Sequence, residues 1–146
     1  MNPLPSTARR THRGAATACA ILLAVYAVCA SSQEVKVTLS GTQEIPPVTT
    51  PASGSGTVTV QADKSLTGSV TISGMAVTVA HIHEAAAGAN GPIITPLSKT
   101  ADNVWSVPPG ARLTDAQYES FKAGNLYFNI HSEAHRSGEI RGQIRP

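Results

Sequence analysis

The residues best suited to chemistry are four histidines, which lie in two short segments. The segment A-H-I-H-E places His81 and His83 one residue apart, and I-H-S-E-A-H carries His131 and His135. Alternate residues of a β-strand point to the same face, so His81 and His83 would present both imidazoles together. Neutral imidazoles bind Cu(II), Zn(II) and Ni(II), and the affinity order among these metals favours copper. The spacing predicts a site for one copper ion, with zinc as the alternative.

Such a site requires the two segments to lie side by side. In L-Y-F-N-I-H, Leu126, Phe128 and Ile130 form an apolar face, so His131 points away from the core. Ile82 separates the first two histidines and points to the core in the same way. If the strands are neighbours, the three imidazoles share the outer side of the sheet.

The alternative is that these histidines are surface residues that hydrogen-bond loop backbone. This interpretation fits His135 best. This residue is the fourth candidate ligand, and it lies in a turn beyond the strand that ends near His131. Glu139 and Arg141 alternate with Ile140 on the last predicted strand and share one face. Glu139 could accept the distal N–H of a ligating histidine, and Arg141 could hold an anion near the site. The simpler expectation for both is an ion pair on an exposed face.

The rest of the sequence consists of short alternating runs separated by turn residues. A turn is expected at 49–56, and a helix at 113–124, where Thr114 and Gln117 form a capping box and Gly124 ends the helix. The sequence predicts an all-β fold, a Greek-key β-sandwich or barrel of about eight strands with one short helix. The strands are expected at 35–40, 57–61, 66–73, 76–83, 93–98, 104–107, 125–132 and 138–144.

The first thirty residues differ in kind from the rest. Three arginines and no acidic residue precede an uncharged apolar run over 15–30, which ends in V-C-A. This order predicts a signal peptide over 1–30, cleaved after Ala30. The run is shorter than the roughly twenty residues of a membrane-spanning helix, so a retained anchor, or a lipid on Cys29, is the lesser alternative. Residues 31–146 are then one exported domain, periplasmic or secreted, with no membrane span.

Composition excludes several classes of function for this domain. Cleavage would remove both cysteines, so no disulfide is expected. Three of the eleven Lys and Arg residues lie in the signal peptide, and the remaining eight stand against nine Asp and Glu, a net charge of −1. That charge gives no indication of nucleic-acid binding. The sequence lacks G-x-S-x-G, a phosphate-binding loop and H-E-x-x-H, so no catalytic residue is predicted.

Three motifs, in order, resemble the CHRD domain family. They are G-T-Q-E-I-P-P-V, then A-H-I-H with A-G-A-N-G-P-I, then A-G-N-L-Y-F-N-I-H-S with G-E-I-R-G-Q-I. The resemblance covers about 35–144. It implies an exported domain of the type named for the extracellular protein chordin, and it implies architecture more than activity.

A weaker resemblance is to copper-zinc superoxide dismutases, whose β-barrel carries an H-x-H strand, a glycine-rich loop and a later copper ligand. His81, His83 and His131 match those ligands, and Arg141 loosely matches the arginine that attracts the anion. The bridging histidine, the zinc-site cluster and the disulfide have no counterpart. The resemblance therefore extends to a copper-only site at most.

The sequence leaves three functions open. The first is a binding module that holds a copper-type ion for metal handling or redox protection. The second is a copper-dependent redox enzyme such as a superoxide dismutase. The third is a metal-free adhesive or structural module of the cell surface, with a protein or polysaccharide partner. A role without catalysis is preferred, because the sequence shows no catalytic motif.

Overall fold

The computed structural model describes residue 1 and residues 32–146, so the predicted signal peptide and Cys29 lie outside the described residues. Nine strands form one sheet, in which all neighbouring strands are antiparallel, in the order β5-β4-β8-β9-β1-β2-β3-β7-β6. The prediction of an all-β fold with one short helix is confirmed. The elements are β1 (Gln33–Ser40), the 3-10 turn η1 (Gly41–Gln43), β2 (Ser53–Val60), β3 (Leu66–Ser73), β4 (Val79–Glu84), β5 (Ile93–Pro96), β6 (Ser98–Ala101), β7 (Val104–Ser106), α1 (Asp115–Lys122), β8 (Leu126–His131) and β9 (Ile140–Ile144).

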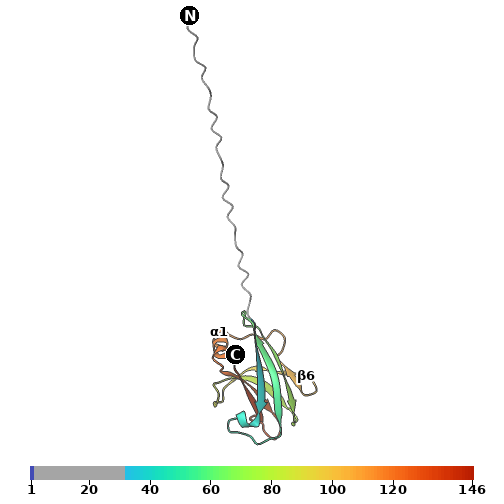
Figure 1. Ribbon diagram of the computed structural model, residues 1–146. Helices are drawn as coiled ribbons and strands as arrows, with labels where there is room; N and C mark the ends of the chain where they lie inside the picture. The colour runs from blue at the N-terminus through green and yellow to red at the C-terminus, as the bar shows by residue number, and fades with distance from the viewer. Residues whose placement is uncertain (2–31) are drawn as a thin grey trace.

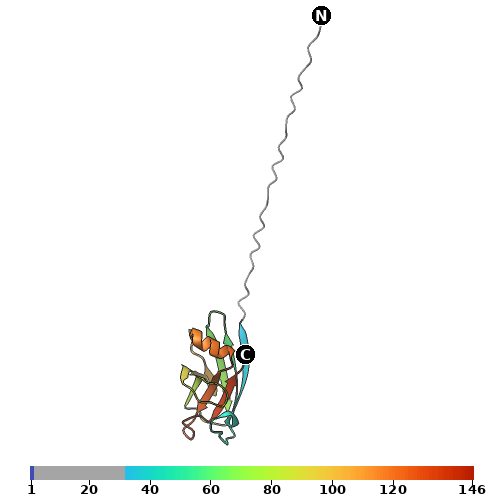
Figure 2. The same ribbon diagram turned by 90° about the vertical axis from the view of Figure 1, so that its left-hand side faces the viewer.

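The sheet curls until its two edges nearly meet. Strands β5 and β6 are the two edges, yet only Leu97 separates them in sequence. A single residue cannot span an open nine-stranded sheet, because it extends the chain by less than about 4 Å. Leu97 is buried and donates its N–H to the carbonyl of Ala80 at 2.9 Å. The sheet is therefore a nearly closed barrel, with α1 and η1 near its opposite ends (Figures 1 and 2).

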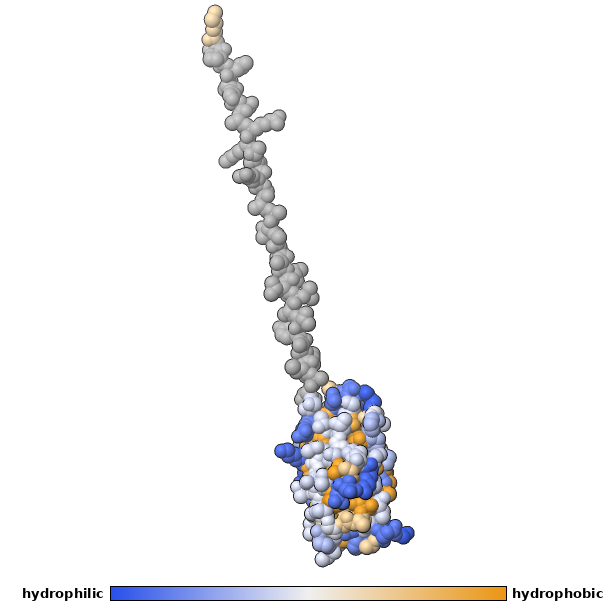
Figure 3. All heavy atoms as spheres, turned by 90° about the vertical axis from the view of Figure 1, so that its right-hand side faces the viewer, coloured by the Kyte–Doolittle hydropathy of each residue, from blue (hydrophilic) through white to orange (hydrophobic). Residues whose placement is uncertain are grey.

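Apolar side chains from alternate positions fill the barrel. Val35, Val37 and Leu39 of β1 point inward, as their spacing predicts. Ile82 of β4 and Ile130 of β8 are fully buried in the same core. On the side that carries β6, apolar residues reach the surface as patches between polar ones (Figure 3). The core thus holds the inner faces of most strands, whereas all four residues of the edge strand β6 are exposed.

Two predicted segments, 49–56 and 93–98, differ from the structure for identifiable reasons, and smaller differences occur at strand ends such as that of β4, which begins at Val79 rather than at 76. The segment 53–56 was expected to be a turn but begins β2, where Gly54 and Gly56 meet other strands closely. A Cβ at Gly56 would lie 2.5 Å from the carbonyl oxygen of Ser69, so glycine serves close approach here. The single strand expected at 93–98 is two edge strands, because the chain crosses from one sheet edge to the other at Leu97.

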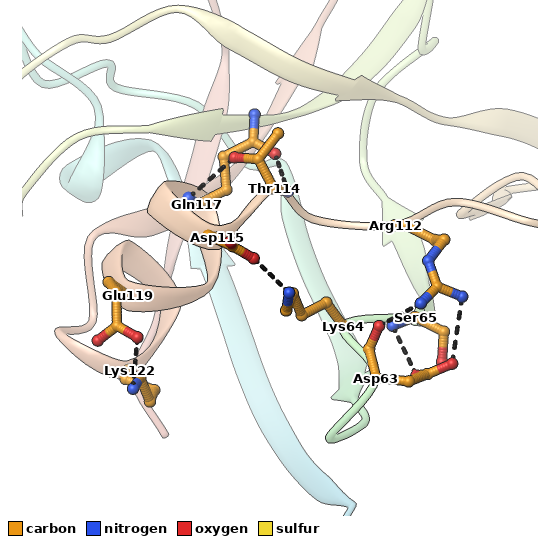
Figure 4. A network of polar contacts seen from close by, with 9 residues as sticks. All are labelled: Asp63, Lys64, Ser65, Arg112, Thr114, Asp115, Gln117, Glu119 and Lys122. Atoms are coloured by element: carbon orange, nitrogen blue, oxygen red, sulfur yellow. Dashed lines mark hydrogen bonds and ion pairs between the residues drawn. The ribbon is translucent and has the colours of Figure 1, made fainter.

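The predicted capping box of α1 is present. The Thr114 hydroxyl accepts the N–H of Gln117 at 3.2 Å, and the Gln117 side chain accepts the N–H of Thr114 at 2.9 Å. Ion pairs tie this end of the helix to the β2–β3 turn: Lys64 contacts Asp115, and Arg112 bonds to Asp63 (Figure 4). Among the described residues, no helix is long and apolar enough to cross a membrane.

Candidate metal centre

The pairing of β4 with β8 brings the predicted ligands together. His83 lies opposite Tyr127, His81 opposite Asn129, and His131 opposite Val79, so the two segments are neighbours in the sheet. The three imidazoles lie on the outer side, since Ile82 and Ile130 occupy the core. His81, His83 and His131 each offer one ring nitrogen, and these atoms all lie within 4.8 Å of one another.

The spacing of two of these nitrogens suits a shared metal ion. Nδ1 of His81 lies 3.2 Å from Nε2 of His131, so the two rings share a hydrogen bond in the metal-free protein. Two nitrogens bound tetrahedrally at Zn–N distances near 2.05 Å lie about 3.3 Å apart. The two rings therefore need little movement to bind one ion.

Backbone carbonyls select the tautomers of two of the rings. Nδ1 of His83 lies 2.9 Å from the carbonyl oxygen of Gly91, and Nδ1 of His131 lies 2.9 Å from that of Arg136. A carbonyl oxygen only accepts, so both Nδ1 atoms carry the proton and both Nε2 atoms carry a lone pair. Metal-ligating histidines are commonly held in this way.

His83 has a buried ring nitrogen without a hydrogen-bond partner. Its Nε2 is the one buried side-chain nitrogen or oxygen of the described residues that has none. A buried acceptor without a partner costs about 1–3 kcal/mol, and such a group needs a specific explanation. Because the lone pair of Nε2 is free, a metal ion would satisfy it.

The electrostatics of the cluster keep its rings neutral. Burial lowers the pKa of His81, and the neighbouring His131 and His83 lower it further. Burial is also the main cause that lowers the pKa of His83 and of His131. Neutral imidazole is the form that binds metal, so protons compete weakly for this site near neutral pH.

The fourth predicted ligand, His135, lies outside this group of three. Its backbone N–H donates to the Ser132 hydroxyl at 3.2 Å, and its carbonyl accepts the N–H of Gly138 at 3.1 Å. Its side chain is close enough to Glu139 to help lower the pKa of that carboxyl. The structure thus brings three of the four histidines together and places His135 in the adjoining turn.

Glu139 and Arg141 are both buried, which differs from the exposed ion pair expected from the sequence. Glu139 accepts hydrogen bonds from the hydroxyls of Thr50 and Ser132, and neither of these is a histidine N–H. Arg141 is only 1% exposed and donates to the carbonyls of Ala89 and Ala86. Loop 85–92 covers Arg141, and Thr50 lies against Glu139, so two different segments bury the outer strand face here.

Sequence reasoning missed two residues of this buried layer. The Tyr127 ring stacks on the His83 ring at a centroid distance of 5.0 Å. The Arg141 guanidinium lies over the same Tyr127 ring, 3.5 Å from its centroid. Glu44 accepts a hydrogen bond from Asn129, and burial raises its pKa to about 7. Tyr127 was predictable as the residue opposite His83, whereas nothing in the pattern shows that Glu44 is covered.

Three neutral nitrogen donors and no carboxylate or thiolate make up the cluster. Such a set suits Cu(II), Zn(II) and Ni(II) better than calcium or magnesium, which prefer oxygen ligands. His81 is the partly exposed member, so the cluster lies close to solvent on that side. This chemistry is compatible with binding an ion and leaving a position for a further ligand.

Comparison with known proteins places the chain in a family. The model of the CHRD domain matches residues 35–144, which include all nine strands except the first two residues of β1. No curated protein and no solved structure matches the chain. The match spans well over half of the sequence, and the chain therefore belongs to the CHRD domain family.

Proposed function

We propose that this protein is a metal-binding module that holds one copper-type ion through His81, His83 and His131. The observation that carries the proposal is the buried, unpartnered Nε2 of His83, on a ring that lies in a group of three imidazoles whose ligand nitrogens are within 4.8 Å of one another. A purely structural histidine would normally have both nitrogens hydrogen-bonded or solvated. The fixed tautomers of His83 and His131 support the same conclusion.

Copper is the preferred ion and zinc the alternative. All-imidazole sites bind both metals, and affinity at a given nitrogen site rises toward Cu(II) and is lower for Zn(II). Metal handling or redox protection fits a site with three ligands on the outer side of a barrel. CHRD domains are typically extracellular, which supports a role outside the cytoplasm.

A redox enzyme is the less favoured function. Superoxide dismutation would use a cation that guides the anion, and Arg141 was the candidate for it. Its guanidinium is buried and donates to Ala89, Ala86 and the Gln143 side chain, so it is engaged within the protein. The structure offers no specific support for catalysis by this residue.

The test is titration of the purified protein with Cu(II) and Zn(II), followed by calorimetry and Cu(II) spectroscopy. We expect binding of one ion per chain, with nitrogen ligands visible in the Cu(II) spectrum. The double variant His81→Ala/His83→Ala should lose this binding, and the matched control His135→Ala should retain it. Failure of the wild-type protein to bind either metal would leave the metal-free adhesive or structural module as the function.

A further inference from the structure

Two loops end at the histidine cluster, and each contributes one backbone carbonyl to it. Loop 85–92, between β4 and β5, brings the Gly91 carbonyl to His83. Turn 132–139, between β8 and β9, brings the Arg136 carbonyl to His131. Each carbonyl selects the tautomer whose Nε2 carries a lone pair; that of His83 has no partner, and that of His131 lies 3.2 Å from Nδ1 of His81. Whatever holds these loops therefore determines which nitrogens face the metal position.

Arg141 holds loop 85–92. Its guanidinium donates to the carbonyl of Ala89 at 2.8 Å and to that of Ala86 at 3.3 Å. The planar guanidinium has five N–H donors in a fixed arrangement, which lets one side chain bind two carbonyls at once. Ala89 lies in the middle of the loop, two residues before Gly91, so these hydrogen bonds fix the part of the loop that leads to the Gly91 carbonyl.

Tyr127 links the same loop to the His83 ring. Its hydroxyl accepts the N–H of Gly91 at 3.1 Å, and its ring lies between the Arg141 guanidinium and the His83 imidazole. The carbonyl and the N–H of Gly91 are thus both bonded, one to His83 and one to Tyr127. A shift of Arg141 would be transmitted to His83 through the backbone and through the stack.

Glu139 holds the other loop by a separate set of contacts. Its carboxylate accepts from the Ser132 hydroxyl, and from the Thr50 hydroxyl at 2.6 Å. The Ser132 hydroxyl in turn accepts the N–H of His135 at 3.2 Å, one residue before Arg136. Burial alone would raise the pKa of Glu139, but the Ser132 and Thr50 hydroxyls outweigh it and the pKa is lowered. The carboxylate is therefore ionised while it holds the turn.

We propose that Arg141 and Glu139 are positioning residues for the histidine cluster. Arg141 acts on His83 through loop 85–92, and Glu139 acts on His131 through turn 132–139. The two sets of contacts share no residue, so Arg141 should set the tautomer of His83 alone and Glu139 that of His131 alone. The effect on copper affinity rests on the proposed function, whereas the effect on the rings does not.

The experiment reads the tautomers in the metal-free protein by long-range ¹H–¹⁵N correlation NMR and then measures Cu(II) affinity by chelator competition. The variants are Arg141→Met, which retains a long apolar side chain over Tyr127 without donors, and Glu139→Ala. The controls are Arg145→Met, just beyond the opposite end of β9, and Glu133→Ala, in the same turn; both residues are exposed, and the Glu133 carboxylate pairs with the Arg136 side chain rather than with its carbonyl. The wild-type protein should show the Nδ1–H tautomer at both His83 and His131.

We expect Arg141→Met to give mixed tautomers at His83 and leave His131 unchanged, and Glu139→Ala to do the reverse. Each should weaken Cu(II) binding about tenfold, at the lower end of the range for residues that orient metal ligands. The controls should change neither readout. If Arg141→Met or Glu139→Ala does not fold, the conservative variants Arg141→Lys and Glu139→Gln replace them. We expect these to change the tautomer of the same ring to a smaller extent.

Unchanged single tautomers in the variants, or equal changes at both rings, would overturn the proposal. Failure of the wild-type protein to bind copper would instead refute the proposed function. The NMR comparison needs no metal, so it decides the positioning roles in either case.

Discussion

Two outer faces of the same barrel carry polar side chains under opposite conditions. The hydroxyl face, on β1, β2 and β3, presents Thr38, Ser55 and Thr71 in one row across three strands, all exposed. The covered face, on β4, β8 and β9, presents His81, Asn129 and Arg141 in the equivalent row. Here Asn129 and Arg141 are buried and His81 is half-buried.

The difference between the two faces is what lies over them. Water solvates the hydroxyl face, so its side chains need no protein partner. Loop 85–92 and the segment after η1 cover the other face. Arg141 donates to the Ala89 carbonyl of the loop, and Asn129 donates to the Glu44 carboxyl of the segment. The loop and the segment are also joined directly, because the Asn90 side chain donates to the Ile45 carbonyl. Burial without partners is costly, and among the described residues the Nε2 of His83 is the one buried side-chain nitrogen or oxygen that has none.

Glu44 provides the largest expected effect on stability. Its pKa is about 7 in the folded protein and 4.5 for the ordinary carboxyl, so the folded state holds a proton that the unfolded state releases. The resulting stability is complete below pH 4.5 and is lost as the pH rises through 7. The variant Glu44→Gln should avoid this loss, which amounts to about 3 kcal/mol at 1.36 kcal/mol per pKa unit.

The measurement is urea unfolding of both proteins between pH 5 and 9. The histidines act in the opposite direction: their lowered pKa values make stability fall as the pH drops below 6.5. They are common to both proteins, so the difference between variant and wild type isolates Glu44. A difference that does not change with pH would show that Glu44 titrates like an exposed carboxyl.

Gly138 tests how tightly the covered face is filled. Its φ is +133°, and a Cβ there would lie 2.6 Å from Nδ2 of Asn129 and 2.7 Å from Oε1 of Glu44. We expect Gly138→Ala to cost about 1–3 kcal/mol of unfolding free energy, from strain and displacement together. Gly88 is the control, since its φ is +83° but nothing lies within 4 Å of a Cβ. Equal losses in both variants in urea unfolding would mean that backbone strain alone is responsible.

The sequence predicts the inner layer of this fold well. Strict alternation in β1 and β8 identified the core residues, and the H-x-H spacing placed His81 and His83 on the outer face. The capping box of α1 was also readable, because Thr114 and Gln117 interact over three residues. These features depend on local periodicity, which a single sequence displays.

The covered face was not predictable in the same way. Glu139 and Arg141 were expected to be exposed because they alternate with Ile140, and alternation says only which face a residue occupies. Whether that face meets water depends on where loop 85–92 folds, and this loop has no period. Gly54 and Gly56 were misassigned for a related reason: their close contacts with neighbouring strands come from distant residues.

The hydroxyl face provides the smallest expected effect. The double variant Thr38→Val/Thr71→Val replaces two exposed hydroxyls by methyl groups and retains the β-branched shape that suits a strand. We expect its unfolding free energy to change by less than about 0.5 kcal/mol, as for surface substitutions generally, and its Cu(II) affinity to equal that of the wild-type protein.

The matched variant on the covered face is Asn129→Ala. It should lower the unfolding free energy by about 1–3 kcal/mol, because it leaves the buried Glu44 without its hydrogen-bond donor. Urea unfolding and analytical ultracentrifugation of the two variants check both faces. A loss in the threonine variant as large as that in Asn129→Ala, or a change in its sedimentation, would mean that the hydroxyl face is itself covered by another molecule in solution.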